Sequence, residues 1–404
     1  MITFNTCQLN FRANLIDVHA HVGKHENITY TKDMLDVFVR QPLPNNDTVE
    51  RMIVSDTDTF KGTGLNEYEG NKRALQSFND DKSYSFLASC SPKNGDVKRI
   101  EQLMQEFPDG FVGLKFHPNE ISLAVSDPKY QPYFEYANRN KIPCMFHTQV
   151  PVDGSGKLFR LPDGTLDLTK LDAFGDPGAI YEAAKKYKDT PFIMAHMGAG
   201  WNESHDRAID ILVESVRKGD ANLYADISWV DIGMEGDTRA LPKDHIVKAI
   251  KKLKGIGESD WTYGDQSFRL MFGTDAPIAR FRGDSARNVY SKFVEEIKTA
   301  IRSDKDLAKD AEKIIEDLFY NNAKKLFFPE NITNAVKKSG GGRGKVIGGI
   351  AAAIAVIGGG AAVLQNKNKK EHSEFIKMLS HLRHNWLRVY GIYYGSRIGA
   401  GEGT

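Results

Sequence analysis

Four short apolar stretches of the sequence each end in a side chain that can bind a metal ion. They end at His21, His147, His196 and Asp275, and the first stretch also carries His19. Residues i and i+2 of a strand point to the same side, so His19 and His21 can reach one ion. Three histidines and one aspartate make a nitrogen and oxygen ligand set that suits Zn²⁺, and also Mn²⁺, Fe²⁺ or Co²⁺.

We therefore expect His19, His21, His147 and Asp275 to hold one divalent metal and to leave a position open for water. Such a metal lowers the pKa of its water to about 7, which provides hydroxide near neutral pH. Asp275 could also take the proton of that water, and His196 could polarise the substrate or move a proton. A single histidine at a strand end is more often a hydrogen-bonded core residue, so the prediction depends on the complete set.

Eight apolar segments alternate with helical patterns between residues 15 and 329. This alternation is typical of parallel β-α-β units, and eight repeats predict an α/β protein with a (β/α)8 TIM barrel, a fold of typically ~250 residues. A doubly wound open sheet is the alternative. The barrel explains better why polar residues recur at the ends of the segments, where this fold builds its active site. The expected strands are 15–21, 51–55, 85–89, 111–117, 142–147, 191–196, 222–227 and 270–275.

Helical spacing recurs between the expected strands, and one long connection departs from it. Residues 148–176 are rich in Gly, Asp and Pro and follow His147, so we expect a loop suited to shaping or covering a site. The expected helices are 66–78, 97–107, 131–140, 177–188, 202–218, 244–253, 285–301 and 306–326, with a short amphipathic piece at 34–39 inside a polar connection, 23–46.

Composition excludes several classes of protein. Lys and Arg number 54 against 53 Asp and Glu, so no global charge favours nucleic acid or an acidic partner. Cys7, Cys90 and Cys144 are few, odd in number and far apart, which favours a reducing compartment over a disulfide framework. The first twelve residues lack the apolar run of a secretory signal. We expect a cytoplasmic protein that acts on a small molecule, and the oligomeric state stays open.

The ordered motifs resemble a known family. Residues 16–23, Ile-Asp-Val-His-Ala-His-Val-Gly, resemble the opening motif of the amidohydrolase superfamily. The full set is similar to its amidohydrolase-2 group of metal-dependent TIM-barrel hydrolases, which also contains decarboxylases. The resemblance covers about residues 13–328 and does not identify a substrate. The other matching motifs are Gly-Leu-Lys-Phe-His-Pro at 113–118, His147, Ala-His-Met-Gly at 195–198, Gly-Thr-Asp-Ala-Pro at 273–277 and Asn-Asn-Ala-Lys-Lys-Leu-Phe at 321–327.

This resemblance implies roles for individual residues. It implies that His196 is a catalytic or second-metal histidine, and that the metal ligands are His19, His21, His147 and Asp275. Some members of the superfamily carry a carbamylated lysine on the fourth strand that bridges two metals, so Lys115 leaves one or two metals open. We favour one metal, with Lys115 and His117 contacting the substrate.

Several other residues have alternative roles. A buried pair between Lys115 and Asp17 is an equal alternative to substrate contact. We expect Asp17 to share the inward face of His19 and His21, where it could orient a ligand. Asp226, at the end of the seventh strand, is a secondary candidate. Arg280 and Arg282 could hold an anionic substrate group, although a solvated loop is the better explanation of either one.

The composition changes after residue 329, which ends the expected barrel region, 1–329. We predict a Gly/Lys-rich linker at 330–345, an apolar Gly/Ala-rich segment at 346–364 and a basic amphipathic helical tail at 365–404. The apolar segment approaches the ~20 residues that a transmembrane helix needs, and the tail could lie on a membrane or bind a partner. Membrane contact through 346–394 is therefore one expectation. A buried or flexible Gly/Ala segment is the other.

Together these features predict a metal-dependent hydrolase that uses an activated water on the carbonyl of a lactone, an amide or an ester. One alternative is metal-dependent, non-oxidative decarboxylation on the same scaffold. The other is a membrane-attached effector or assembly component that uses the barrel as a sensor or a nucleotide-processing module.

Overall fold

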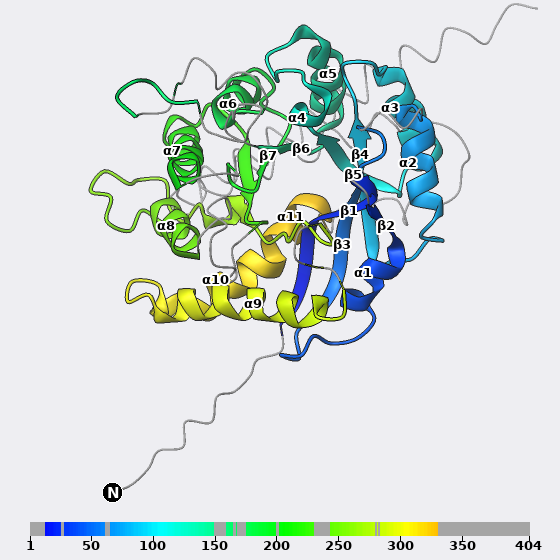
Figure 1. Cartoon of the computed structure of the whole chain (residues 1–404). Coiled ribbons are helices and arrows are strands. Elements are labelled where there is room, and N and C mark those ends of the chain that lie inside the picture. The colour runs from blue at the N-terminus through cyan, green and yellow to red at the C-terminus, as the bar shows by residue number, and fades with distance from the viewer. Residues whose placement is uncertain are drawn as a thin grey trace, which may run out of the picture. The chain divides into compact units, whose positions relative to one another are not determined.

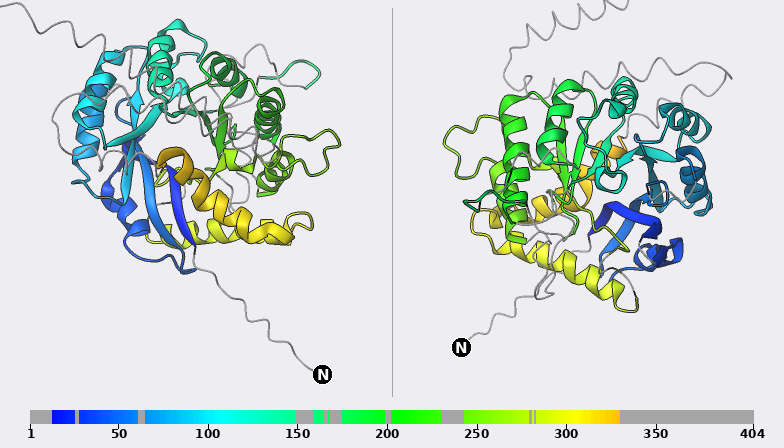
Figure 2. Two further views of the ribbon diagram at one scale, coloured as in Figure 1. Left: turned by 180° about the vertical axis from the view of Figure 1, so that it is seen from behind. Right: turned by 45° about the horizontal axis from the view of Figure 1, so that its top comes forward.

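Eight parallel strands curve into a barrel in the computed structural model (Figures 1 and 2). Neighbouring strands pair in parallel in chain order. All eight correspond to the strands expected from the sequence, which confirms that prediction. They are β1 (Asn14–His25), β3 (Thr48–Asp56), β4 (Tyr84–Cys90), β5 (Phe111–Phe116), β6 (Cys144–His147), β7 (Phe192–Ala195), β8 (Leu223–Asp226) and β9 (Leu270–Met271).

The segment that follows β9 pairs with β1 and closes the sheet. The amide of Val18 donates to the carbonyl of Phe272 at 3.0 Å, and the amide of His21 donates to the carbonyl of Ala276 at 2.7 Å. In return, the amide of Asp275 donates to the carbonyl of His19 at 2.8 Å. These bonds support a closed (β/α)8 barrel over the open sheet. A short strand that the sequence did not predict, β2 (Ile28–Tyr30), pairs antiparallel with the end of β1.

The structure describes residues 13–25, 28–60, 65–148, 159–164, 167, 175–198, 202–229, 243–278, 281 and 283–329. All of them belong to one unit of the chain, Met1–Asn334. The predictions for Arg280, Arg282, most of the loop at 148–176 and all of residues 330–404 lie outside the described residues. Within the described part, no helix combines the length and the apolar character needed to cross a membrane.

Helices surround the barrel on its outside (Figures 1 and 2). Several begin at caps that the sequence supplies: Asn66 and Glu69 form a capping box at α2, and Asp176 caps α6 ahead of Pro177. The expected helix at 306–326 is interrupted by a π-helical turn, Asp317–Asn321. The helices are α1 (Lys32–Val39), α2 (Glu67–Gln76), α3 (Val97–Glu106), α4 (Pro118–Ile121), α5 (Gln131–Asn140), α6 (Pro177–Lys186), α7 (Asn202–Lys218), α8 (Lys243–Leu253), α9 (Ala286–Ser303), α10 (Ala311–Glu316) and α11 (Asn322–Phe327).

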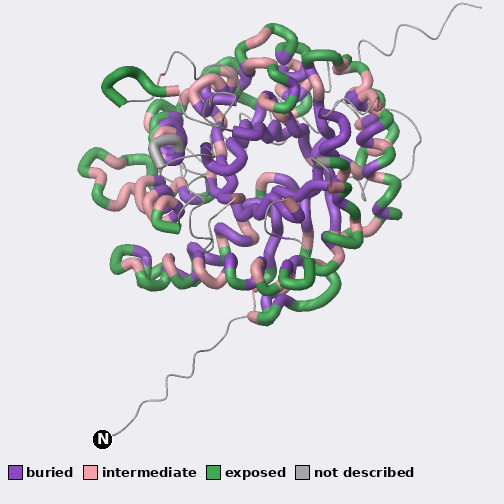
Figure 3. The backbone as a smooth tube through the Cα atoms, in the orientation of Figure 1, coloured by how far each residue is buried: buried purple, intermediate pink, exposed green. Residues whose placement is uncertain are grey.

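Buried residues line both surfaces of the sheet (Figure 3). The larger apolar cluster fills the space between strands and helices, and includes the stacked rings of Phe116, Phe146 and Phe192. A smaller cluster fills the inside of the barrel. It consists of Ile16, Val18, Ile53, Leu87, Met145, Ile193, Ala195 and Met271, packed with Ala323 and Phe327 of α11.

A bulge in β1 decides which way its side chains face. Asp17 pairs with Met52 and Ala20 pairs with Val54, so three steps along β1 oppose two steps along β3. A bulge of this kind shifts the alternation of side chains by one residue. Two residues that are an even number of positions apart, one before the bulge and one after it, therefore face opposite sides of the sheet. Ala20 accordingly packs in the outer core.

Asp17 consequently lies outside the barrel, and the prediction that it shares the face of His19 and His21 is wrong. Its carboxylate accepts hydrogen bonds from the Thr274 hydroxyl at 2.6 Å and from the Tyr290 hydroxyl at 3.0 Å. The first of these ties β1 to the segment after β9, and the second ties it to α9. The physical reason for the error is the bulge, which a regular two-residue alternation cannot anticipate.

Candidate metal centre

The structure brings the seven principal site residues predicted from the sequence into one mostly buried cluster at the carboxyl ends of the strands. Two come from β1, two from β5 and the residue after it, and one each from the ends of β6, β7 and β9. This is the end of a (β/α)8 barrel at which active sites form. The residues are His19, His21, Lys115, His117, His147, His196 and Asp275.

Three of these side chains converge on one point. The Nε2 atoms of His19 and His21 lie 3.0 Å apart. Asp275 Oδ1 lies 2.9 Å from the Nε2 atom of His21 and 3.4 Å from that of His19. All three residues are buried, and their donor atoms lie close enough together to hold one metal ion.

The hydrogen bonds on the far sides of the two rings fit this use. His19 Nδ1 lies 3.0 Å from Asp226 Oδ2. A carboxylate only accepts, so Nδ1 carries the hydrogen and the lone pair of His19 is on Nε2. His21 Nδ1 lies 2.9 Å from the hydroxyl of Ser55, which leaves its Nε2 facing the Asp275 carboxylate. Partners of this kind on the far nitrogen are typical of histidines that bind a metal ion.

Lys115 supplies the positive charge nearest to this point. Its side chain is fully buried, and Nζ lies 2.7 Å from His19 Nε2. Burial lowers the pKa of Lys115 to about 8, against the attraction of Asp226 and Asp275. The ammonium group is therefore mainly protonated at pH 7. The alternative pairing of Lys115 with Asp17 is wrong, because Asp17 lies on the other side of β1.

The other histidines form a second part of the cluster. His196 Nε2 lies 3.1 Å from His147 Nδ1, and the ring of His147 stacks on that of His117 with centroids 4.0 Å apart. The ring of His196 stacks on that of His19 at 4.7 Å. His147 thus joins the site through His196 and is not one of the three residues whose donor atoms converge. Its role as the fourth ligand stays a prediction.

Burial keeps most of these imidazoles neutral. It lowers the pKa of His21 to about 4, and it lowers the pKa values of His117 and His196 well below the usual value. Burial alone would raise the pKa of Asp275, but its interaction with His196 and the hydrogen bond from His21 hold it well below its usual range. At pH 7 the cluster therefore offers neutral nitrogen ligands beside an ionised carboxylate.

One part of the site has only a weak signal in the sequence, namely the residues at and after the end of β8. Asp226 was a secondary candidate, and Ser228 and Trp229 were missed. The Ser228 hydroxyl lies 3.0 Å from His19 Nδ1 and 2.7 Å from His196 Nδ1, and the Trp229 ring stands edge-on to His196. A signal was present, because Asp-Ile-Ser repeats the i, i+2 spacing of His-Ala-His.

Several of these side chains belong to residues whose backbone lies in the left-handed region, which sets the direction of the side chain. His196, Trp229 and Asp275 have φ angles of +62°, +60° and +68°. Non-glycine residues in unfavourable backbone regions cost about 1–3 kcal/mol each and cluster at functional sites. The amide of His196 donates to Asp226 Oδ1 at 3.0 Å, which helps to hold its turn. The three residues follow β7, β8 and β9, where the chain must leave the barrel and still present a side chain to its centre.

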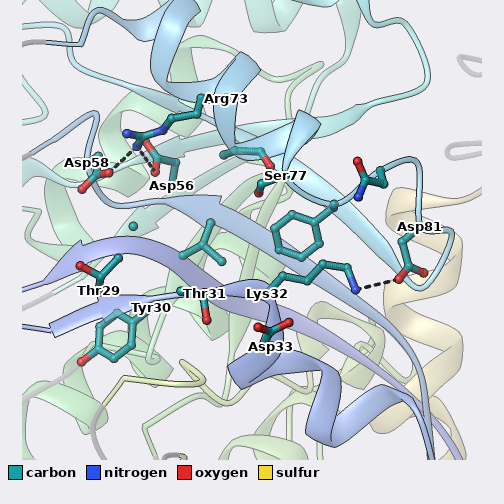
Figure 4. Close-up of a pocket in the computed structure, with 15 residues that line it drawn as sticks. Thr29, Tyr30, Thr31, Lys32, Asp33, Asp56, Asp58, Arg73, Ser77 and Asp81 are labelled. Carbon is teal, nitrogen blue, oxygen red and sulfur yellow. Dashed lines mark hydrogen bonds and ion pairs between the residues drawn. The ribbon is translucent and has the colours of Figure 1, made fainter.

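A hollow of about 790 Å³ is lined by charged residues such as Asp56, Asp58 and Arg73 (Figure 4). It lies between β2, α1, α2 and the end of β3, and its charged groups pair with one another. Arg73 pairs with Asp58 and lies 3.7 Å from Asp56, and Lys32 lies 3.1 Å from Asp81. None of the described site histidines lines this hollow, so size alone does not mark the chemistry.

Comparisons with known proteins agree with this architecture. A family model described as amidohydrolase matches residues 16–328. Among curated proteins, none matches the chain. The structure of a proposed 2-pyrone-4,6-dicarboxylic acid hydrolase from Pseudomonas putida is 13% identical, with 79% of this chain and 99% of that chain covered and a TM-score of 0.50. At this identity the likeness supports the fold alone.

Two other solved structures resemble the chain more loosely. An amidohydrolase from Burkholderia multivorans with bound zinc is 13% identical over 78% of this chain and 99% of that chain, with a TM-score of 0.49. A dihydroxybenzoic acid decarboxylase from a Polaromonas species with bound manganese is 16% identical over 78% of this chain and 97% of that chain, with a TM-score of 0.48.

Proposed function

The chain belongs to the amidohydrolase family of metal-dependent enzymes, and from that premise we propose that it is a hydrolase. It would use a metal-activated water on the carbonyl of a lactone, an amide or an ester. The observation that carries this proposal is the convergence of His19 Nε2, His21 Nε2 and Asp275 Oδ1 within 3.4 Å.

We assign the metal to His19, His21 and Asp275, with His147 as a fourth ligand. The donor set suits a divalent ion, Zn²⁺ first, with Mn²⁺, Fe²⁺ and Co²⁺ as alternatives. When bound, such an ion supplies a Lewis acid and lowers the pKa of a water to about 7.

The catalytic side chains would then be Asp275 and His196. The Asp275 carboxylate is ionised, so it can accept the proton of the nucleophilic water. His196 is a neutral ring next to the converging atoms, so it can take up a proton and then polarise the substrate carbonyl or pass the proton to the leaving group. A metal held here, together with protonated His196, would stabilise the negative charge that develops on the substrate oxygen.

Lys115 and His117 are the proposed contacts to the substrate. His117 Nδ1 is buried and has no hydrogen-bond partner among the described residues. Its ring lies between those of His147 and Phe60, with centroids 4.0 Å and 5.5 Å away. A buried polar atom without a partner is costly, and a substrate hydrogen bond would relieve that cost.

One observation favours decarboxylation as a second candidate. The Lys115 ammonium group is buried within the cluster, where it could bind the carboxylate of an acid substrate. His196 would then protonate the carbon that loses CO₂. Assaying one panel of lactones, esters and amides for hydrolysis, and one of aromatic acids for CO₂ release, separates the two reactions.

Metal analysis of the purified full-length protein tests the proposal. We expect about one equivalent of divalent metal, and its loss in His19→Ala. His245→Ala is the matched control, because His245 pairs with Asp206 on the outer helices. A native wild type that takes up no divalent metal, or a His19→Ala variant that keeps it, would contradict the proposal. Two equivalents would favour a bridging role for Lys115.

A further inference from the structure

One hydroxyl group lies between the two parts of the histidine cluster. Ser228 Oγ is 2.7 Å from His196 Nδ1 and 3.0 Å from His19 Nδ1, and it also contacts Asp226 Oδ1. Ser228 is fully buried, as is Asp226. The direction of the hydrogen bonds around Ser228 therefore decides which nitrogen of each neighbouring ring carries a hydrogen.

The chemistry of the three neighbours fixes that direction. A hydroxyl has one hydrogen to donate, and a carboxylate can only accept. Asp226 Oδ1 is the only one of the three neighbours that cannot donate, so the Ser228 hydrogen belongs there. If Ser228 instead donated to His196, the two oxygen atoms of Ser228 and Asp226 would face each other without a hydrogen between them. Ser228 Oγ must therefore accept from the His196 ring.

We propose that Ser228, held by Asp226, fixes His196 as the tautomer with its hydrogen on Nδ1. Nε2 of His196 then carries a lone pair, and it faces His147 Nδ1 at 3.1 Å. His147 must therefore donate from Nδ1, which leaves the lone pair of His147 on Nε2. Ser228 is thus a positioning residue that sets the donor atom of His147 through His196.

The same pair of residues also orders His19. Asp226 Oδ2 accepts from His19 Nδ1 at 3.0 Å, so His19 presents the lone pair of Nε2 to the converging point. Ser228 and Asp226 would in this way give both His19 and His147 the tautomer that ligates through Nε2. This inference rests on the proposed function only where it calls these atoms ligands, because the tautomers themselves exist without metal.

Nitrogen NMR of the metal-free, full-length protein with ¹⁵N-labelled histidine tests the tautomers directly. The His196 signals are assigned by their loss in His196→Gln. We expect the hydrogen of His196 on Nδ1 in the wild type, and on Nε2 or shared between both nitrogens in Ser228→Ala. A wild-type His196 with its hydrogen on Nε2 would overturn the proposal, whether or not the variant folds.

Zinc titration against a competing chelator provides a second readout. Loss of a group that orients ligands typically lowers metal affinity 10–100-fold, so we expect at least ~10-fold weaker zinc binding in Ser228→Ala. Ser215→Ala is the matched control. Ser215 is equally buried, and it donates to the Leu212 carbonyl on the outer helix α7. We expect unchanged zinc binding in that variant.

The outcomes separate this proposal from the proposed function. A Ser228→Ala variant with the wild-type tautomer and wild-type zinc affinity would overturn the role of Ser228 and leave the hydrolase proposal standing. A wild type that takes up no zinc or other divalent metal would overturn the hydrolase proposal, and the His196 tautomer would still decide the role of Ser228.

Discussion

The two ends of the barrel hold buried charged side chains in opposite ways. At the amino end, Asp47 precedes β3 and lies 2.5 Å from the ammonium group of Lys298 on α9. Its carboxylate also accepts from the amide of Ala13 at 2.9 Å and from Asn45 Nδ2 at 2.6 Å. This buried acid is fully supplied with donors. At the carboxyl end, His19, His21 and Asp275 instead bring three possible metal-ligand atoms together.

This difference distinguishes a structural charge from a functional one. A buried ion pair with complete hydrogen bonds requires no further ligand, and removal of one partner destabilises the fold. Ligand atoms that converge in a buried site can instead hold an added cation, so they mark a candidate binding site. Substitutions at the amino end should therefore change stability without changing metal binding. Substitutions at the carboxyl end should do the reverse.

The largest expected effect is at the amino end. Lys298→Met leaves the Asp47 charge buried without its cation, and breaking such a pair typically costs about 3–5 kcal/mol. Urea unfolding of the metal-free protein measures this loss. Lys292→Met is the control, because Lys292 pairs with Glu296 at 3.7 Å on the exposed side of the same helix, and its free energy of unfolding should change by less than ~1 kcal/mol. If Lys298→Met and Lys292→Met lowered the free energy of unfolding equally, the buried pair at the amino end would have no special role in stability.

The next effect is on metal affinity at the carboxyl end. Asp275→Asn removes the only negative charge among the three converging groups, so zinc should bind more than ~100-fold more weakly, beyond the range for groups that merely orient ligands. The free energy of unfolding without metal should fall less than in Lys298→Met, because the asparagine keeps an amide oxygen that can accept from His21. Chelator competition measures the zinc affinity, and urea unfolding measures the free energy of unfolding. Undiminished zinc affinity would contradict the assignment.

Two buried carboxylates, those of Asp226 and Asp17, should differ in their effect on zinc binding. Asp226→Asn should weaken zinc binding about 10–100-fold, because it removes the acceptor that orients His19. Asp17→Asn should leave zinc affinity unchanged, because Asp17 faces Thr274 and Tyr290 across the outer core. Chelator competition measures the zinc dissociation constants of both variants. If Asp17→Asn weakened binding as much as Asp226→Asn, the bulge would not separate the two faces.

The smallest expected effect is a pH dependence of the free energy of unfolding, caused by a carboxylate at the carboxyl end of the barrel. Burial raises the pKa of Asp56 from 3.8 to about 6, with a further contribution from the charge of Asp58. The folded protein therefore holds this proton to higher pH than the unfolded chain, and stability falls as the pH rises from about 4 to about 6. Asp56→Asn should remove about 1 kcal/mol of that fall between pH 5 and pH 7 in urea unfolding. Identical pH profiles of variant and wild type would rule this out.

Much of the site was predictable because its signal is local. His-x-His on an apolar segment predicts two side chains on one face, and the structure brings His19 and His21 to within 3.0 Å. The order of the eight segments predicted the barrel, since strands that follow one another through β-α-β units commonly lie side by side. These features depend on spacing within a segment, which a sequence displays directly.

The features that were missed depend on partners elsewhere in the chain. The face of Asp17 depends on the pairing of β1 with β3, where the bulge forms. Ser228 acquires its role only because His19 and His196 approach it from two other strands. The π-helical turn at 317–321 interrupts a helix whose apolar spacing looked continuous, and the antiparallel β2 lay within a polar connection. None of these follows from the periodicity of one segment.

The most direct test of the account is anomalous diffraction at the zinc edge from crystals grown with zinc. We predict one strong peak bounded by His19 Nε2, His21 Nε2 and Asp275 Oδ1, and no peak at Asp47 and Lys298. A well-ordered crystal with no anomalous peak among these three atoms would contradict the claim that His19, His21 and Asp275 form a metal site.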